Sequence, residues 1–151
     1  MIFGQGNRFW MSLILGASLL AGCSRDPQVA KKKHFDRGDS YFEAGKYREA
    51  AIEYQNAIQI DPRFAPAHFK LAESYLKLQD WQRGYQELLR SIDLQPDDWK
   101  AQLTLGNILL ASGRFPDARD RAGIILKGDP QNAEAQMLLA NADAEIGRAH
   151  V

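Results

Sequence analysis

The side chains that could do chemistry in this sequence are a pair of histidines, one cysteine and several closely spaced carboxylates. His34 and His68 are separated by the same interval at which other residues recur, and they could be taken for a shared metal site. Neighbouring helices pack about 8–10 Å apart, whereas each ligand of one zinc ion must come within about 2.1 Å of it. We therefore expect the histidines to serve packing, and we predict no metal site.

The carboxylates form no obvious acid–base pair for catalysis. Asp97 and Asp98, and Asp117 and Asp120, fall at expected helix starts or on exposed helix faces, where capping and the helix dipole account for them. Glycines occur singly rather than in a phosphate-binding loop, and no Gly-x-Ser-x-Gly motif is present. We predict that the chain is not an enzyme, and we infer no cofactor and no small-molecule substrate.

Composition excludes further classes of protein and of partner. The 151 residues include 19 Lys and Arg and 19 Asp and Glu, with 45% hydrophobic and 25% charged residues. These are ordinary values for a globular protein of one to one and a half domains. Because no basic stripe accompanies the zero net charge, nucleic acid is not an expected partner. Cys23 is the only cysteine, so it has no partner for an intramolecular disulfide.

The first 22 residues have the layout of a secretory signal peptide. Apart from the amino terminus they carry one cation, Arg8, and no acid, and an apolar run of 14 residues extends from Phe9 to Gly22. A bilayer-spanning helix needs about 20 apolar residues. The run therefore favours a cleaved signal over a permanent membrane span.

The end of this run, Leu20-Ala21-Gly22-Cys23, resembles the bacterial lipobox. The resemblance implies cleavage before Cys23, which becomes a lipidated amino terminus. Two or three acyl chains hold a protein stably on a bilayer, so we expect a membrane anchor at Cys23 followed by a polar tether over 23–30. Ser24 after the cysteine implies, by the same resemblance, the periplasmic face of the outer membrane.

A period of 34 residues organises the rest of the chain. Pro62, Pro96 and Pro130 recur at this interval, and three further positions follow it. One position holds only small residues, namely Gly38, Ala72, Gly106 and Ala140. A second is also small, at Ala50, Gly84 and Ala118, and a third is aromatic, at Tyr47, Trp81 and Phe115.

This pattern of small residues, aromatics and a closing proline resembles the tetratricopeptide repeat family. The resemblance covers residues 31–144, as three repeats (31–64, 65–98 and 99–132) and the first helix of a fourth (133–144). It implies an all-α fold, a right-handed α-solenoid of stacked helix-turn-helix hairpins whose first helices line the concave side. Helices are predicted at 31–44, 47–60, 65–78, 81–94, 98–112, 115–127 and 132–144.

Helix physics explains the same pattern. Apolar residues recur every three or four positions within each predicted helix, and small residues allow antiparallel helices to approach closely. Each proline cannot continue a helix interior, so it separates one hairpin from the next. Asp97 or Asp98 and Asn132 are suitable caps for the helices that follow.

The family resemblance places a protein or peptide partner in the concave groove. At the family's contact positions we expect apolar side chains and a few polar ones, namely Phe35, Asp39, Phe42, Phe69, Glu73, Leu76, Leu103, Asn107 and Leu110. Some members of the family hold a C-terminal carboxylate with asparagines and a lysine. Asn107 and Asn141 match the asparagines, but Leu103 and Met137 stand where the lysine belongs, which disfavours that mode.

The carboxyl terminus ends within the predicted fourth repeat. Residues 145–151 resemble one reading frame of a sequencing adapter. We interpret them as an artefactual tail, and we expect the natural gene to continue. Gly147, at the position of an inter-helix turn, is the argument for a natural sequence.

Two functions follow from these expectations. The first is a non-catalytic, membrane-anchored scaffold that supports assembly of an envelope complex, such as a pilus secretin, an outer-membrane protein assembly machine or a polysaccharide exporter. The alternative is the docking module of a longer envelope enzyme encoded beyond residue 151.

Overall fold

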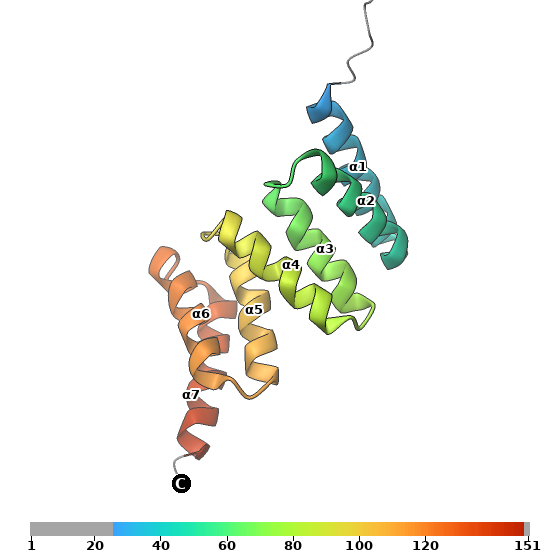
Figure 1. Ribbon diagram of the computed structural model, residues 1–151. Helices are drawn as coiled ribbons and strands as arrows, with labels where there is room; N and C mark the ends of the chain where they lie inside the picture. The colour runs from blue at the N-terminus through green and yellow to red at the C-terminus, as the bar shows by residue number, and fades with distance from the viewer. Residues whose placement is uncertain (1–25, 150–151) are drawn as a thin grey trace, which may run out of the picture.

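Helical hairpins follow one another along the part of the chain that the structure describes. The computed structural model describes residues 26–149, which form seven helices and no strand: α1 (Pro27–Glu43), α2 (Tyr47–Ile60), α3 (Ala65–Lys77), α4 (Trp81–Leu94), α5 (Trp99–Ala111), α6 (Phe115–Gly128) and α7 (Ala133–Ala149). Each helix packs on the next, so that α1 and α2 lie at one end of the stack and α6 and α7 at the other (Figure 1). The predicted all-α class and helix order are confirmed.

Helix α1 begins earlier than predicted. Asp26 caps it by accepting a hydrogen bond from the Gln28 amide at 2.9 Å, and Pro27 occupies the first turn, where its missing N–H costs nothing. Residues 27–30 were predicted to belong to a polar tether, and that prediction is wrong. Cys23 and the predicted signal peptide, residues 1–22, lie outside the described residues.

Helix α7 also extends beyond its predicted end. It continues through Ala149, and Arg148 pairs with Glu145 at 2.5 Å within it. Gly147 therefore lies in a helix and not in a turn. None of the described helices is long and apolar enough to cross a bilayer.

The turns and caps follow the 34-residue period. The turn inside each hairpin uses a left-handed residue at the same position, Gly45 (φ 72°), Gln79 (φ 61°) and Gly113 (φ 77°). Glycine adopts this conformation without strain, whereas glutamine does so at a cost. The Asp98 carboxylate caps α5, and the Asn132 side chain accepts from the Ala135 amide at 3.0 Å, as predicted.

Small residues set the close contacts between helices. Gly38 of α1 lies against the Tyr54 ring of α2, and a Cβ at residue 38 would come within 2.5 Å of that ring. Tyr54 is fully buried together with Ala50 and Ala57 of the same helix. One hydrophobic cluster joins α1, α2 and α3, and a second runs from α3 and α4 through to α7.

The two histidines contact different carboxylates. The Nδ1 atom of His34 lies 2.7 Å from Glu53, and that of His68 lies 2.7 Å from Glu87, in each case on the second helix of the same hairpin. The His68 Nε2 atom also lies 3.2 Å from the Pro62 carbonyl oxygen. The histidines therefore join helices within their own hairpins. Among residues 26–149, no group of three His, Cys, Asp or Glu side chains is arranged to hold a metal ion.

Candidate functional site: an open groove on the first helices

The first helices of successive hairpins share one open hollow. It has a volume of about 420 Å³, and three apolar side chains in equivalent positions face it, Phe35 of α1, Phe69 of α3 and Leu103 of α5. We call it the groove hollow; its other lining residues are Pro66, Lys70, Glu73, Asp98, Trp99, Lys100, Thr104 and Glu134. Helices α1, α3, α5 and α7, the first helices of successive repeats, all contribute to its lining.

Aromatic packing holds Phe35 at one end of this groove. Its ring centroid lies 5.6 Å from that of Tyr54 and 5.1 Å from that of Phe64. Edge-to-face and tilted pairs at such distances add stability beyond burial alone. The half-buried Phe35 side chain thus lines the groove hollow while its two aromatic neighbours hold it in position.

Carboxylates gather at the same end. The Tyr54 hydroxyl donates a hydrogen bond to Asp39 at 2.7 Å. Burial raises the pKa of Tyr54 above its ordinary value of 10.0, and the hydrogen bond to Asp39 raises it further. The negative charges of Asp39, Glu73 and Glu43 act in the same direction. Of these three carboxylates, Glu73 lines the groove hollow, whereas Asp39 and Glu43 do not.

Lys70, which also lines the groove hollow, already has partners within the protein. Its ammonium lies 2.8 Å from Glu73 and 5.1 Å from the centroid of the Phe42 ring. The opposite charges of Lys70 and Glu73 therefore largely cancel for an incoming ligand.

Three of the predicted contact residues pack between helices rather than lining the groove hollow. Phe42 makes an edge-to-face contact with Tyr47 at 5.2 Å. Leu76 lies over Gly84 of α4, and Leu110 packs against the second hydrophobic cluster. All three occupy one register position, which turns toward the second helix of the hairpin. Asn107 is exposed and lines a separate hollow beside Trp81.

Several groove residues were missed by the sequence analysis. Lys70 and Thr104 lie one residue after Phe69 and Leu103, on the side of the helix that also carries Glu73 and Asn107. Helical periodicity could have found them, because residues three and four apart share a face. Asp98, Trp99 and Glu134 line the groove from helix amino termini. Their participation depends on how the hairpins stack, which no local pattern encodes.

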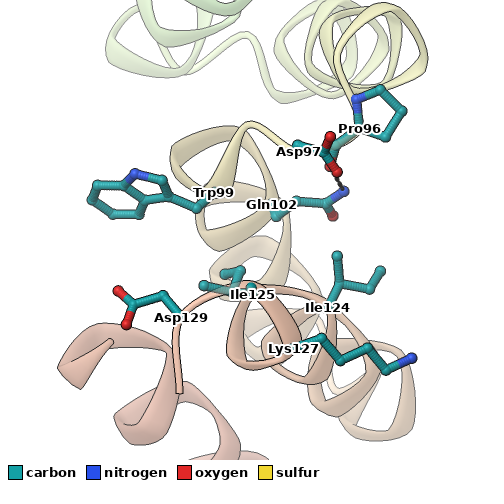
Figure 2. A pocket seen from close by; sticks show the side chains of 9 residues that line it. Pro96, Asp97, Trp99, Gln102, Ile124, Ile125, Lys127 and Asp129 are labelled. Atoms are coloured by element: carbon teal, nitrogen blue, oxygen red, sulfur yellow. Dashed lines mark hydrogen bonds between the residues drawn. The ribbon is translucent and has the colours of Figure 1, made fainter. Parts of the chain in front are cut away.

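A further hollow opens between α5 and α6, away from the predicted contact positions. This α5–α6 hollow has a volume of about 550 Å³, and Trp99, Gln102, Ile124 and Ile125 are among its lining residues (Figure 2). The equivalent position to Ile125 in the preceding repeat is Ser91, whose hydroxyl donates to the Ala65 carbonyl oxygen at 3.1 Å. Trp99 likewise stands where that repeat has Ala65. These larger side chains hold the two helix ends apart.

Comparison with known proteins identifies the repeats. A model described as TPR repeat matches residues 38–79, and two models described as tetratricopeptide repeat match residues 66–98 and 86–142. The chain carries tetratricopeptide repeats. Together the three TPR matches run without a gap from α1 to α7, and no catalytic family is indicated.

Curated and solved relatives agree with this fold. DnaJ homolog subfamily C member 3 of Rattus norvegicus is 30% identical over 115 residues, which is 74% of this chain and 23% of the relative. The chain thus spans about a quarter of that protein's length. The first TPR of Spaghetti (RPAP3), bound to HSP90 peptide SRMEEVD, superposes with a TM-score of 0.73 at 23% identity, covering 81% of this chain and 96% of that one.

A second solved TPR domain is somewhat more similar in sequence. The second TPR domain of human RPAP3, in complex with HSP70 peptide SGPTIEEVD, has a TM-score of 0.70 at 26% identity and covers 78% of this chain and 98% of that one. The described part of this chain is therefore an all-α TPR solenoid, of the kind that serves as a protein-interaction module.

Proposed function

We propose that this chain is a non-catalytic TPR scaffold that binds an extended segment of a partner protein in its groove hollow. The observation that carries this proposal is the row formed by Phe35, Phe69 and Leu103, which three successive first helices present to one open hollow. Apolar side chains at equivalent positions along a groove, with polar groups between them, suit a peptide that contacts each repeat in turn. Both solved relatives described above hold peptides.

We propose further that the scaffold is lipid-anchored through Cys23 at the periplasmic face of the outer membrane, where it supports assembly of an envelope complex. Support comes from the 14-residue apolar run and the Leu-Ala-Gly-Cys sequence that ends it. Labelled palmitate should enter the protein in bacterial cells and be lost on Cys23→Ser; palmitate absent from the wild-type chain would contradict the proposed anchor.

A second candidate is the docking module of a longer envelope enzyme. The rat relative is itself much longer than the region matched here, which is 23% of its length. The reading frame beyond residue 151 separates the two candidates. Further 34-residue periods support the scaffold, whereas a region with a nucleophile or metal-binding motif supports the enzyme.

Crosslinking in intact cells tests the groove directly. Phe69→Glu places a charge in the middle of the apolar row, and we expect it to abolish partner crosslinks. Ile52→Glu is the matched control, because Ile52 lies on α2, is 57% exposed and does not line the groove hollow. Unchanged crosslinks in a folded Phe69→Glu variant, with the same result in the control, would remove the groove as the binding site.

A further inference from the structure

A strongly apolar hollow lies beside the groove hollow, at the junction between the second and third repeats. This Trp81 hollow has a volume of about 570 Å³ and is lined by Trp81, Thr104, Asn107, Ile108, Ala111 and Ser112. Trp81 is 61% exposed, although the sequence pattern assigned it only to the aromatic position that opens each second helix. Together with Ile108 and Ala111 it forms a contiguous exposed apolar surface, a feature that marks interaction sites.

Two differences in sequence between the repeats leave this hollow open. At the preceding junction Phe42 packs against Tyr47, and Lys70 lies over the Phe42 ring. At the second junction the residues equivalent to Phe42 and Lys70 are Leu76 and Thr104.

Leu76 turns toward α4 because Gly84 leaves space for it; a Cβ at residue 84 would lie 2.8 Å from the Leu76 Cδ2 atom. Trp81 therefore has no aromatic partner from α3, and α5 packs less extensively on α4 than α3 packs on α2.

The two hollows adjoin at Thr104, which lines both. Asn107, one helical turn further along α5, lines the Trp81 hollow. A ligand that extends from the groove hollow along α5 would therefore reach the Trp81 hollow next. An extended peptide advances about 3.3 Å per residue, so a short segment suffices to place side chains in both.

The charges along this path select the ligand. Glu73, Asp98 and Glu134 line the groove hollow, against Lys70 and Lys100. Lys70 is paired with Glu73, and Lys100 lies 5.6 Å from the Trp99 ring centroid. The charges of Lys70 and Glu73 largely cancel, which leaves Asp98 and Glu134 against Lys100 and an excess of one carboxylate in the lining. The groove hollow therefore favours a cationic ligand, whereas the peptides held by the two solved relatives end in Glu-Glu-Val-Asp.

We propose that the partner segment is an extended basic peptide, which places a Lys or Arg against the carboxylates of the groove hollow and a large apolar side chain against Trp81. This inference rests on the proposed function, because it names the ligand class of the same groove. Charge supplies selectivity against acidic tails. The Trp81 hollow supplies an apolar anchor of the kind that dominates binding energy at interfaces.

Selection from a random 12-residue peptide display library tests the proposal, with the full chain in mild detergent as bait and Phe69→Glu as the groove-defective bait. We expect the peptides that bind only the unmodified groove to combine Lys or Arg with Trp, Phe or Leu. Two defined probes then measure the charge preference by fluorescence anisotropy, the acidic peptide SGPTIEEVD and the amidated charge-inverted peptide SGPTIKKVK. The inverted probe should bind at least tenfold more tightly at low salt and lose affinity as salt rises.

Substitutions in the protein test the basic and the apolar contacts of the selected peptides separately. Glu73→Gln with Glu134→Gln should weaken the selected peptides about tenfold; both residues line the groove hollow and neither is buried, so the fold is preserved. Trp81→Ala should weaken them by a similar factor. The control is Glu49→Gln with Asp120→Asn, two exposed carboxylates that line neither hollow, and it should change nothing.

The possible failures are distinct. Groove-dependent peptides that are acidic or uncharged, or that ignore Trp81→Ala, would overturn this inference and leave the groove as a binding site. If no selected peptide distinguishes the unmodified bait from Phe69→Glu, the proposed function fails and the inference fails with it.

Discussion

The two ends of the stack repeat one spacing with different side chains. Tyr54 of α2, Leu88 of α4 and Ala122 of α6 occupy equivalent positions, and all three are fully buried. The side chain at this position therefore shrinks from the first hairpin to the third. The third hairpin also contains the α5–α6 hollow, whereas Ser91 and Ala65 bring α4 and α3 together directly in the second. The period thus sets where helices lie, and individual side chains set how closely they pack.

A polar contact also differs between the second and third repeats, because the hydrogen-bond donors and acceptors on the second helix are exchanged. We call it the polar bracket: a first-helix side chain that contacts both the carbonyl oxygen of the preceding closing proline and a side chain on the second helix. In the second repeat both nitrogens of His68 face acceptors, Glu87 and the Pro62 carbonyl.

In the third repeat Gln102 donates to the Pro96 carbonyl at 2.9 Å and accepts from Arg121 at 3.2 Å. Exchange of histidine for glutamine thus accompanies exchange of a carboxylate for a guanidinium. Because a carboxylate only accepts hydrogen bonds and a guanidinium only donates them, each first-helix side chain suits its own partner.

The largest expected difference in stability between the two ends comes from adding a methyl group at a glycine, in Gly38→Ala and in Gly106→Ala. In Gly38→Ala the new Cβ meets the fixed ring of Tyr54, and overpacking of a buried site costs about 1–3 kcal/mol. In Gly106→Ala it meets the terminal methyl of Leu138, which can rotate away, so the steric cost is smaller. Both variants gain up to about 1 kcal/mol in helix propensity, which offsets more of the cost at residue 106. Urea unfolding followed by circular dichroism measures both. Equal losses would show that the two ends are packed alike.

Alkaline pH should lower the stability of the first repeat through ionisation of Tyr54, which has no titrating counterpart in the other repeats. Its raised pKa keeps it neutral when folded, while the unfolded chain ionises near pH 10.0. The stabilisation is therefore complete below pH 10 and is lost as pH rises. At pH 11 the free energy of unfolding should fall by about 1.4 kcal/mol.

The control for this prediction is Tyr54→Phe, which cannot ionise at that position. Its unfolding free energy, measured at pH 8 and pH 11, should lack this component of the decline. A parallel decline in both proteins would assign the effect to other tyrosines. Leu88 and Ala122 leave the equivalent positions of the other repeats without a group that titrates.

The smallest expected effect on the free energy of unfolding comes from exchanging the residues of the polar bracket. His68→Gln and Glu87→Arg each leave a mismatched pair in the second repeat, whereas the double variant copies Gln102 and Arg121 of the third. The two substitutions should therefore compensate each other, with a coupling energy of about 1 kcal/mol in a double-mutant cycle. Strict additivity in urea unfolding would mean that the second and third brackets are not interchangeable.

Much of the fold could be predicted because it is encoded locally. Small residues, aromatics and prolines at a 34-residue interval predicted all seven helices, and α2 and α4 have the predicted bounds. Asp98 and Asn132 cap the helices that follow them. The start of α1 was missed because Asp26 and Pro27 form a capped first turn that lies outside the period.

The lining of the groove hollow was predictable only in part. Phe35, Phe69 and Leu103 line the groove hollow, but Phe42, Leu76 and Leu110 turn toward neighbouring helices. A register position determines the side of a helix on which a residue lies. Whether that side faces a groove or another helix depends on the stacking of the hairpins.

The amino-acid sequence by itself determined the helices, their turns and the order in which they pack, since helix periodicity, capping and proline act over a few residues. Only the tertiary structure decided which side chains remain open to a partner. Trp81 became exposed because Leu76 moves onto Gly84, and Lys70 is engaged because Glu73 and Phe42 both reach it. Such outcomes depend on the volume and charge of side chains that meet across helices, and spacing along the chain carries no measure of either.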